Sequence, residues 1–430
     1  MTVDNTHHPL QKVLIVGGGI SGLTLANALK HQGIPCVVYE RDESPQSRTQ
    51  GWSLSLHMAM EHLKRCFPLE RFENFGREAS VNYEDNEGNV VYKLYDGKDG
   101  RVFTTVQREP YAAYRVSRSR FRHWLLQDIE EIVHWNKRVS RYEEDDQGQV
   151  TVYFTDGTQD TGDLLVASDG SQSSVACQLY GGALPFKQAT HISHARGFGA
   201  TYWISEEVWK SVSTSNSQTA AIIGTVTEDA DKRVAGKTIR MLYTLNKIDR
   251  SRPETPYEIL WFVSIFLEQD NLVPFPDGSN DEEVLNMIRA WCASAFSGSP
   301  SHQKITAQTP KHTPIHGLTL RERIPRHDVL YSPGRRVVLT GDAAHPMTVY
   351  KGEGANHAII DASNLAVEIS HAFNNTKTLD EAISSYYDEM IPRGENAVTQ
   401  SHIASEKVHS TREQVIEMYK SMRGATVASV

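Results

Sequence analysis

Residues 12–40 read KVLIVGGGISGLTLANALKHQGIPCVVYE, and this stretch decides the fold. An apolar run, KVLIV, is typical of a buried parallel strand. The pattern G-x-G-x-x-G follows at 17–22, then a helical stretch that ends near Gly33, then a second apolar run, CVVY. Glu40 closes this run, 18 residues after Gly22. Strand, glycine loop, helix, strand and acid in this order predict a βαβ unit that binds a dinucleotide.

Each glycine of the loop has a separate physical task in such a unit. Gly17 permits a tight turn, Gly19 lets the backbone approach a pyrophosphate, and Gly22 allows close packing of helix on strand. The start of the helix offers unpaired N–H groups to the phosphates, and Glu40 is placed to accept hydrogen bonds from ribose hydroxyls. The motif does not choose between NAD and FAD.

Two distant segments bear on that choice. The run DLLVASDGS at 163–171 predicts a strand that ends at Asp169 and Gly170, a dipeptide that by itself indicates only a turn. The run RRVVLTGDAAH at 335–345 predicts another strand, with Asp342 at its end, followed by a helix that begins near Gly354. Asp342 is therefore expected to reach a second polyol. The backbone from Gly352 to Asn356 is expected to lie against a flat ring.

With these three motifs in this order, the chain resembles the group A FAD-dependent monooxygenases, the para-hydroxybenzoate hydroxylase-like family. GDAAH at 341–345 is the most family-specific segment. Val116, Arg118, Phe121 and Leu125 match a further helix motif of the family. The stretch SRTQGWSLSLH around Arg48 resembles the tetracycline-inactivating flavin monooxygenases within it.

The resemblance implies FAD as the cofactor and NAD(P)H as a transient reductant, because no second dinucleotide motif is present. It places Arg48 near the redox edge of the flavin, as a catalytic residue. It also implies a set of cofactor-binding residues: Gly17, Gly19, Gly22, Glu40, Arg118, Asp169, Asp342, Gly354, Ala355 and Asn356. The family has no fixed substrate motif, and no catalytic base is named.

The loop after GDAAH departs from the family pattern. Thr348 and Val349 stand where prolines are usual, and Lys351 and Glu353 replace a common Gly and Gln. In the family this loop faces the flavin where oxygen reacts. The departure supports an alternative, a flavin enzyme of the same fold without productive oxygen transfer, such as a reductase, dehydrogenase or cyclase. A non-catalytic FAD-binding protein is the third hypothesis.

The middle of the chain predicts the layer that selects the substrate. Runs such as GFGATYWI, TAAIIGTVT, KTIRMLYTL and EILWFVSIF indicate strands of an antiparallel sheet. The aromatic side chains on these strands are candidate pocket walls: Tyr202, Trp203, Tyr243, Trp261 and Phe262. From about Leu379 the pattern is helical, and Pro392 is expected to break the helix.

The expected fold class is α/β, with a Rossmann-like FAD-binding layer interleaved with an antiparallel substrate sheet and C-terminal helices. The FAD-binding layer is expected from 1–80, 105–180 and 325–375, the substrate domain from 81–104 and 183–324, and the helical segment from 376–430.

Composition excludes several classes of protein. The net charge of −9 and the lack of a basic stripe argue against a nucleic-acid partner. Four widely spaced cysteines argue against a disulfide scaffold, and no histidine pattern has metal-ligand spacing, so no metal site is expected. With neither a membrane-spanning run nor a signal-peptide core, a cytoplasmic location is expected.

The sequence thus predicts a single-component FAD-dependent monooxygenase that consumes NAD(P)H and dioxygen. The expected substrate is an apolar, aromatic or polycyclic small molecule that is hydroxylated, with epoxidation or Baeyer–Villiger insertion next, in a tailoring step of secondary metabolism. The sequence does not predict the oligomeric state.

Overall fold

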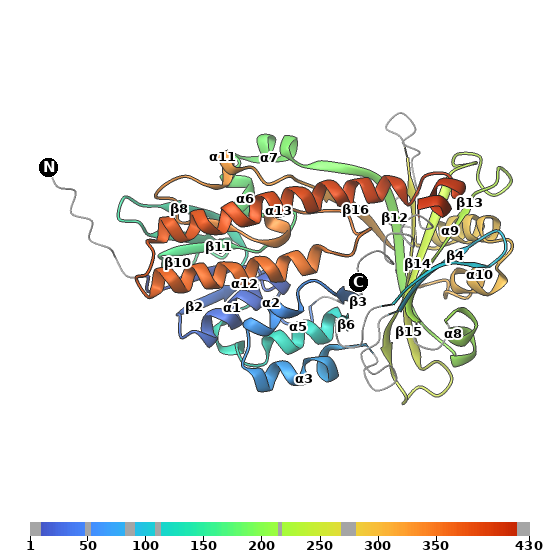
Figure 1. The fold of residues 1–430 in the computed structure, drawn as a ribbon, viewed down its shortest axis with the longest axis horizontal. Helices are drawn as coiled ribbons and strands as arrows, with labels where there is room; N and C mark the ends of the chain where they lie inside the picture. The colour runs from blue at the N-terminus through green and yellow to red at the C-terminus, as the bar shows by residue number, and fades with distance from the viewer. Residues whose placement is uncertain are drawn as a thin grey trace, which may run out of the picture.

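The computed structural model describes residues 10–47, 53–81, 91–107, 113–213, 217–267 and 281–418. Figure 1 shows two layers side by side, a part with parallel strands and long helices at the left and a large sheet at the right. Segments from both halves of the sequence build the left part, so the chain crosses between the layers more than once.

A five-stranded parallel sheet forms the centre of the first layer. Its spatial order is β17-β11-β1-β2-β7. Every residue of β1 is buried because helices cover this sheet, and the helix that follows β1 packs on α12. The bounds of these elements are β1 Val13–Val16, α1 Ile20–His31, β2 Cys36–Tyr39, β7 Val133–His134, β11 Leu164–Ala167, β17 Val337–Leu339 and α12 Gly354–Phe373.

A seven-stranded sheet forms the second layer, in the order β16-β12-β15-β14-β13-β4-β5. Its strand pairs are antiparallel except β13 with β4, which is parallel. Helices α8, α9 and α10 cover one face (Figure 1). The bounds are β4 Val91–Asp96, β5 Val102–Gln107, β12 His191–Ile204, α8 Glu206–Val212, β13 Ser217–Thr225, β14 Thr238–Ile248, β15 Tyr257–Phe266, α9 Asp281–Ala295, α10 Pro300–Ala307 and β16 His316–Glu322. The predicted α/β class with an added, mainly antiparallel sheet is confirmed.

Smaller elements connect the two layers and flank the parallel sheet. Strand β3 pairs with β6, and β8, β9 and β10 form a three-stranded sheet. Their bounds are β3 Ser53–Leu56, α2 Met60–Arg65, α3 Leu69–Ala79, β6 Tyr114–Ser117, α5 Arg118–Leu126, β8 Val139–Glu144, β9 Val150–Phe154, β10 Gln159–Gly162, α6 Ser174–Leu179, α7 Ala183–Ala189 and α11 His327–Leu330.

Helix α13, Leu379–Lys407, runs along the first layer and reaches the second (Figure 1). The Thr378 hydroxyl accepts from the Glu381 N–H and the Glu381 carboxylate accepts from the Thr378 N–H, a capping box that fixes the start of the helix. The expected break at Pro392 is wrong, since the helix continues through it. A proline inside a helix costs about 3 kcal/mol, and this cost is offset by the packing of α13 on α12 and by the burial of α13 side chains such as Tyr387 and Met390.

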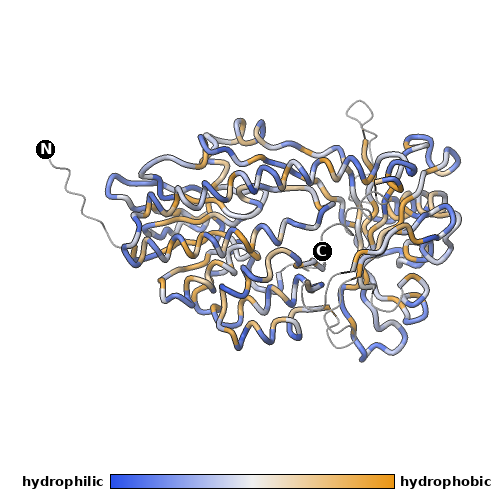
Figure 2. The backbone as a smooth tube through the Cα atoms, viewed as in Figure 1, coloured by the Kyte–Doolittle hydropathy of each residue, from blue (hydrophilic) through white to orange (hydrophobic). Residues whose placement is uncertain are grey.

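Hydrophobic residues concentrate in the strands of both layers, as the orange segments of Figure 2 show. Two large apolar clusters result, one around the parallel sheet and one between the seven-stranded sheet and helices α8 to α10. Within the described ranges, none of the helices has the length and apolar character needed to cross a bilayer.

Candidate functional site

A cavity of about 700 Å³ lies where the two layers meet. Its floor consists of strand ends of the parallel sheet, and its roof consists of strands of the seven-stranded sheet. Eight of the predicted cofactor-binding residues line it: Gly17, Gly19, Glu40, Arg118, Asp169, Asp342, Gly354 and Ala355. Residues 17 and 342 stand far apart in the chain, and the parallel order of β1, β11 and β17 brings their strand ends together.

The glycine loop forms one end of the cavity. Gly17 has φ +109°, which favours glycine, and its N–H donates to the Tyr39 carbonyl at 2.8 Å. A Cβ on Gly22 would stand 2.1 Å from the Gly17 carbonyl oxygen and 2.4 Å from Ser168 Oγ. Gly22 is therefore a packing residue behind the cavity, and it lets α1 approach β1 so closely that the first turn of the helix faces the cavity.

Glu40 holds the same loop from the end of β2. Its Oε2 accepts from the Gly18 N–H at 2.7 Å, and its Oε1 accepts from the Asp42 N–H at 2.9 Å. Arg122 of α5 lies beside it, 3.8 Å from Oε2, and donates from Nε to the Gly18 carbonyl at 2.9 Å. Arg122 was not predicted. From helix α5, Arg122 contacts both the glycine loop and Glu40 and so holds them together.

Asp169 stands at the end of β11 with one carboxylate oxygen in use. Its Oδ2 accepts from the Ser174 N–H at 3.0 Å, whereas Oδ1 is buried and has no hydrogen-bond partner among the described residues. Burial raises the pKa of Asp169 above its ordinary value. A buried acceptor without a donor at a cavity wall is suited to a ligand hydroxyl.

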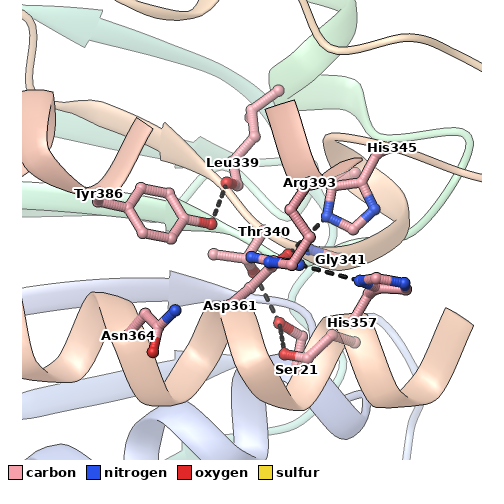
Figure 3. A network of polar contacts seen from close by, with 12 residues as sticks. Ser21, Leu339, Thr340, Gly341, His345, His357, Asp361, Asn364, Tyr386 and Arg393 are labelled. Carbon is pink, nitrogen blue, oxygen red and sulfur yellow. Dashed lines mark hydrogen bonds and ion pairs between the residues drawn. The ribbon is translucent and has the colours of Figure 1, made fainter. Parts of the chain in front are cut away.

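Asp342 faces the same cavity from the GDAAH segment. Surrounding protein raises its pKa through desolvation, and the positive charges of His345, Arg118 and Arg323 oppose this shift. A network in the core fixes the segment (Figure 3). Asp361 of α12 accepts from the Gly341 N–H and from His345 Nε2, each at 2.7 Å, and pairs through Oδ1 with Arg393 at 2.7 Å.

This network keeps the carboxyl group of Asp361 ionised. Burial alone would raise the pKa of Asp361, but the positive charges of His345 and Arg393 hold that pKa below its ordinary value. Ser21 at the start of α1 also joins the network, with its hydroxyl 2.8 Å from that of Thr340 (Figure 3). The glycine loop and the GDAAH segment are thereby connected beneath the cavity.

Besides Gly22, one other predicted cofactor residue does not line the cavity, and the predicted catalytic residue cannot be placed. The Asn356 side chain is buried, where it accepts from the N–H groups of His57 and Met58 and donates to the Ser55 and Gly352 carbonyls. Asn356 therefore positions the neighbouring loops, rather than lining the cavity as expected. Arg48 lies outside the described residues.

Of the five aromatic pocket candidates, only Phe262 lines the cavity. Side chains alternate across a strand, so Phe262 faces the first layer while Trp261 faces helices α9 and α10. The Trp261 indole N–H donates to Thr309, and the hydroxyls of Tyr202 and Tyr243 bond to the carbonyls of Ile305 and Val212. Trp203 packs against Lys247 and Arg252. The expectation for these four is corrected: three build the core behind the roof, and Trp203 stacks on cations away from the cavity.

Sequence reasoning missed Arg115 of β6. Its side chain is 8% exposed, lines the cavity, and donates to the hydroxyls of Ser53 and Ser55. Burial lowers the pKa of Arg115 to about 9. Among the described residues no carboxylate pairs with it, so a buried positive charge faces the cavity with only neutral partners. Its place in a short strand of mixed composition, YRVS, gave no signal of a site.

The residues present fit FAD. The glycine loop and the start of α1 suit a pyrophosphate, Glu40 suits a ribose, and Asp169 and Asp342 offer acceptors to further hydroxyls. The backbone from Gly352 to Ala355 borders the remaining length of the cavity and suits a flat ring. When bound, FAD supplies electron transfer and oxygen chemistry. The chain binds and orients it.

Comparisons with known proteins agree with this geometry. The family model "FAD binding domain" matches residues 11–236 and 297–401. The FAD-dependent monooxygenase thnD of Trichoderma harzianum is 30% identical, over 93% of this chain and 95% of that protein. The FAD-dependent monooxygenase cctM of Talaromyces islandicus is 25% identical, over 94% of each.

Among solved structures, HpxO of Klebsiella pneumoniae in complex with FAD and uric acid has the same fold. The TM-score is 0.71 at 22% identity, covering 96% of this chain and 93% of that one. The family match covers more than half of the chain, and the relative at 30% identity spans nearly all of it. The chain therefore belongs to the family of FAD-dependent monooxygenases.

Proposed function

We propose that this enzyme works as a single component, takes electrons from NAD(P)H, and inserts one oxygen atom of dioxygen into an aromatic or polycyclic small molecule. Hydroxylation is the expected reaction, with epoxidation and Baeyer–Villiger insertion as alternatives. One observation carries the proposal: the predicted cofactor residues and the roof of the second sheet line the same cavity. A substrate held under the roof would lie against a flavin held on the floor.

The roof has the composition expected for such a substrate. Leu242, Leu260 and Phe262 face the cavity from β14 and β15 and offer apolar surface to a ring system. Gly197 on the neighbouring β12 leaves room for the Phe262 ring, since a Cβ there would stand 2.0 Å from Phe262 Cζ. Apolar side chains in this position would help to keep water away from a substrate above the floor.

Arg115 refines the substrate class. A buried guanidinium without a carboxylate partner among the described residues favours a ligand that brings negative charge. In an aromatic substrate this is an ionisable hydroxyl or a carboxyl group. We infer that the substrate is an acidic phenol, an enol or an aromatic acid, with its charged oxygen directed toward Arg115.

A second function, oxidation or reduction without oxygen transfer, is supported by the loop after GDAAH. Thr348, in place of a usual proline, is 2% exposed and donates to the Ser401 carbonyl at 2.7 Å, while the Ser401 hydroxyl donates to the Thr348 carbonyl at 2.7 Å. This pair fixes the loop to α13, and Val349 faces the cavity beside it. Because this is where oxygen reacts in the family, the altered loop is the motivation for the alternative.

The test measures NAD(P)H oxidation by the FAD-loaded enzyme against a panel of acidic phenols and aromatic acids in air. The proposal expects substrate-dependent NAD(P)H consumption, little hydrogen peroxide, and a product heavier than its substrate by one oxygen atom. A product that has lost or gained only hydrogen would support the alternative function. NAD(P)H consumption that yields only hydrogen peroxide with every compound would contradict the proposed substrate class.

A further inference from the structure

Three side chains from distant parts of the chain meet outside the cavity, at the edge of the seven-stranded sheet. His191 is the first residue of β12 and pairs across strands with Glu322, the last residue of β16. His402 reaches them from α13. Glu322 Oε2 lies 2.9 Å from His402 Nδ1 and 3.8 Å from His191 Nε2. We name this set the His-Glu-His cluster.

The spacing of the three atoms suits a metal ion. Nitrogen and oxygen ligands of zinc lie roughly 2.0–2.2 Å from the ion, so tetrahedral ligands stand about 3.3 Å from one another. The observed distances of 2.9 and 3.8 Å lie on both sides of this value, and all three ligand atoms lie within 4.8 Å of one another. Small rotations of the histidine rings would bring each nitrogen into coordination range.

The state of Glu322 points to a missing ligand independently of these distances. Its side chain is only 5% exposed, and its second oxygen, Oε1, is buried without a hydrogen-bond partner among the described residues. A buried carboxylate oxygen without a donor is costly and calls for an explanation. A cation bound to this carboxylate between the two histidines would neutralise its buried charge.

A further carboxylate, that of Glu406, lies near the other ring nitrogen of His402. Its Nδ1 faces Glu322, while its Nε2 lies 3.6 Å from the Glu406 carboxylate one turn further along α13. A metal-binding histidine commonly donates its other ring N–H to a carboxylate, which fixes the tautomer and strengthens the ligand. Glu406 is placed for that role.

We propose that the His-Glu-His cluster binds a zinc ion through His191 Nε2, the Glu322 carboxylate and His402 Nδ1, with water in the fourth position. Imidazole and carboxylate ligands suit this ion. The predicted absence of a metal site rested on ligand spacing in the sequence, and it missed the cluster because the ligands come from three distant elements. None of the three residues lines the cavity, so the ion has no part in the oxygen chemistry.

The zinc ion connects the edge of the sheet to α13. Residues next to two of its ligands contact the segments around the cavity. Arg323, next to Glu322, donates to the Ala343 carbonyl at 2.7 Å. Ser401, next to His402, bonds to Thr348. Metal binding therefore stabilises the junction of the two layers next to the GDAAH segment.

Zinc titration of the full-length, FAD-loaded protein tests this proposal, after removal of any affinity tag and treatment with a chelator. Calorimetry and metal analysis are expected to give one tight equivalent of zinc per chain and a higher melting temperature. Glu322→Gln and His402→Ala should each lose this equivalent and the temperature rise. Glu406→Gln should weaken binding by roughly 10- to 100-fold. His316→Ala is the matched control, because His316 is an exposed histidine on the same strand as Glu322.

Cobalt provides a second readout, since tetrahedral cobalt absorbs at wavelengths longer than the flavin does. The proposal expects these bands in the parent protein and in His316→Ala, and their loss in Glu322→Gln with FAD still bound. A parent protein that binds no tight equivalent overturns the proposal, and the cluster is then an ion pair between Glu322 and a protonated histidine. Zinc binding that persists in both Glu322→Gln and His402→Ala also overturns it.

Discussion

Asp361 accepts a hydrogen bond from His345 at 2.7 Å in the core, with both side chains at most 1% exposed. The same carboxylate accepts from the Gly341 N–H and pairs with Arg393. Because these contacts lie at both ends of GDAAH, they fix the segment that directs Asp342 into the cavity (Figure 3). A single acid of α12 thus positions a cofactor residue without lining the cavity itself.

Replacing Asp361 with Asn tests this positioning role. The substitution leaves His345 and Arg393 with a neutral partner, and breaking a buried charge pair costs about 3–5 kcal/mol. We expect a lower free energy of unfolding by this amount and weaker FAD retention, measured by denaturation and by flavin content after gel filtration. Val367→Ala, at an exposed position on the same helix, is the control and should change neither strongly. Unchanged stability in Asp361→Asn would contradict the role.

Replacing Asp342 with Ala separates FAD binding from stability. Desolvation raises the pKa of Asp342, so its charge does not stabilise the free protein. We therefore expect the variant to fold normally but to lose FAD, as a colourless protein with normal circular dichroism. Asp328→Ala, at an exposed acid, should stay yellow. An Asp342→Ala protein that retains its full flavin content would argue against the assigned site.

Gly22→Ala tests the close packing beneath the glycine loop. The new Cβ would meet the Gly17 carbonyl at 2.1 Å, so backbone must shift. We expect a loss of about 1–3 kcal/mol in unfolding free energy, as for overpacked cores, together with reduced FAD affinity. At Gly317 the nearest atom to a new Cβ is 4.0 Å away, so Gly317→Ala should be tolerated. Equal unfolding free energies and FAD affinities for the two variants would show that the packing between α1 and the glycine loop is less tight than described.

Two buried histidines predict a loss of stability in acid. Burial lowers the pKa of His302 and His409 to about 4, from 6.5 in the unfolded chain. Protons then bind the unfolded state preferentially, so the stabilisation is complete above pH 6.5 and is lost as pH falls toward 4.

Each of these histidines contributes a slope of up to about 1.4 kcal/mol per pH unit in that window. The measurement is the free energy of unfolding from pH 7 to 4, compared between the parent protein and His409→Gln. The variant should show a shallower slope, whatever its absolute stability. An identical slope would mean that His409 is protonated in the folded protein.

Arg115→Gln tests the substrate class. A hydrogen bond to a charged group contributes about 1.5–3 kcal/mol, which corresponds to a KM increase of roughly 10-fold or more for an acidic phenol. The methyl ether of the same phenol should show little change, because it brings no charge to the site. Arg141→Ala, at an exposed position, is the control. Equal effects on the phenol and its ether would show that Arg115 serves the protein or the cofactor rather than the substrate.

The fold could be predicted because its signals are local in the sequence. Strand, glycine loop, helix and acid follow one another within 12–40, and the apolar runs of the later strands are continuous. The aromatic pocket residues could not be predicted in the same way. Most of β15 is buried on both faces, so its pattern does not distinguish Phe262, which faces the cavity, from Trp261, which faces the helices.

The remaining site residues depend on contacts between distant segments. Asp361 and Arg393 lie on two helices that meet only in the folded chain, and Arg115 becomes a buried cation only when β3 and β6 pair. A single sequence carries no trace of such contacts. The sequence motifs therefore predict which segments lie close to the cofactor. The tertiary structure adds the residues that hold these segments in place.

The proposed function requires the transfer of one oxygen atom from dioxygen to the substrate. Turnover under oxygen gas enriched in its heavy isotope, with NAD(P)H in excess and ordinary water as solvent, tests it most directly by mass spectrometry of the product. A monooxygenase puts one heavy oxygen atom into each product molecule. A product formed at a normal rate with no heavy oxygen would contradict the proposed function and would identify the enzyme as a flavin oxidoreductase that does not transfer oxygen.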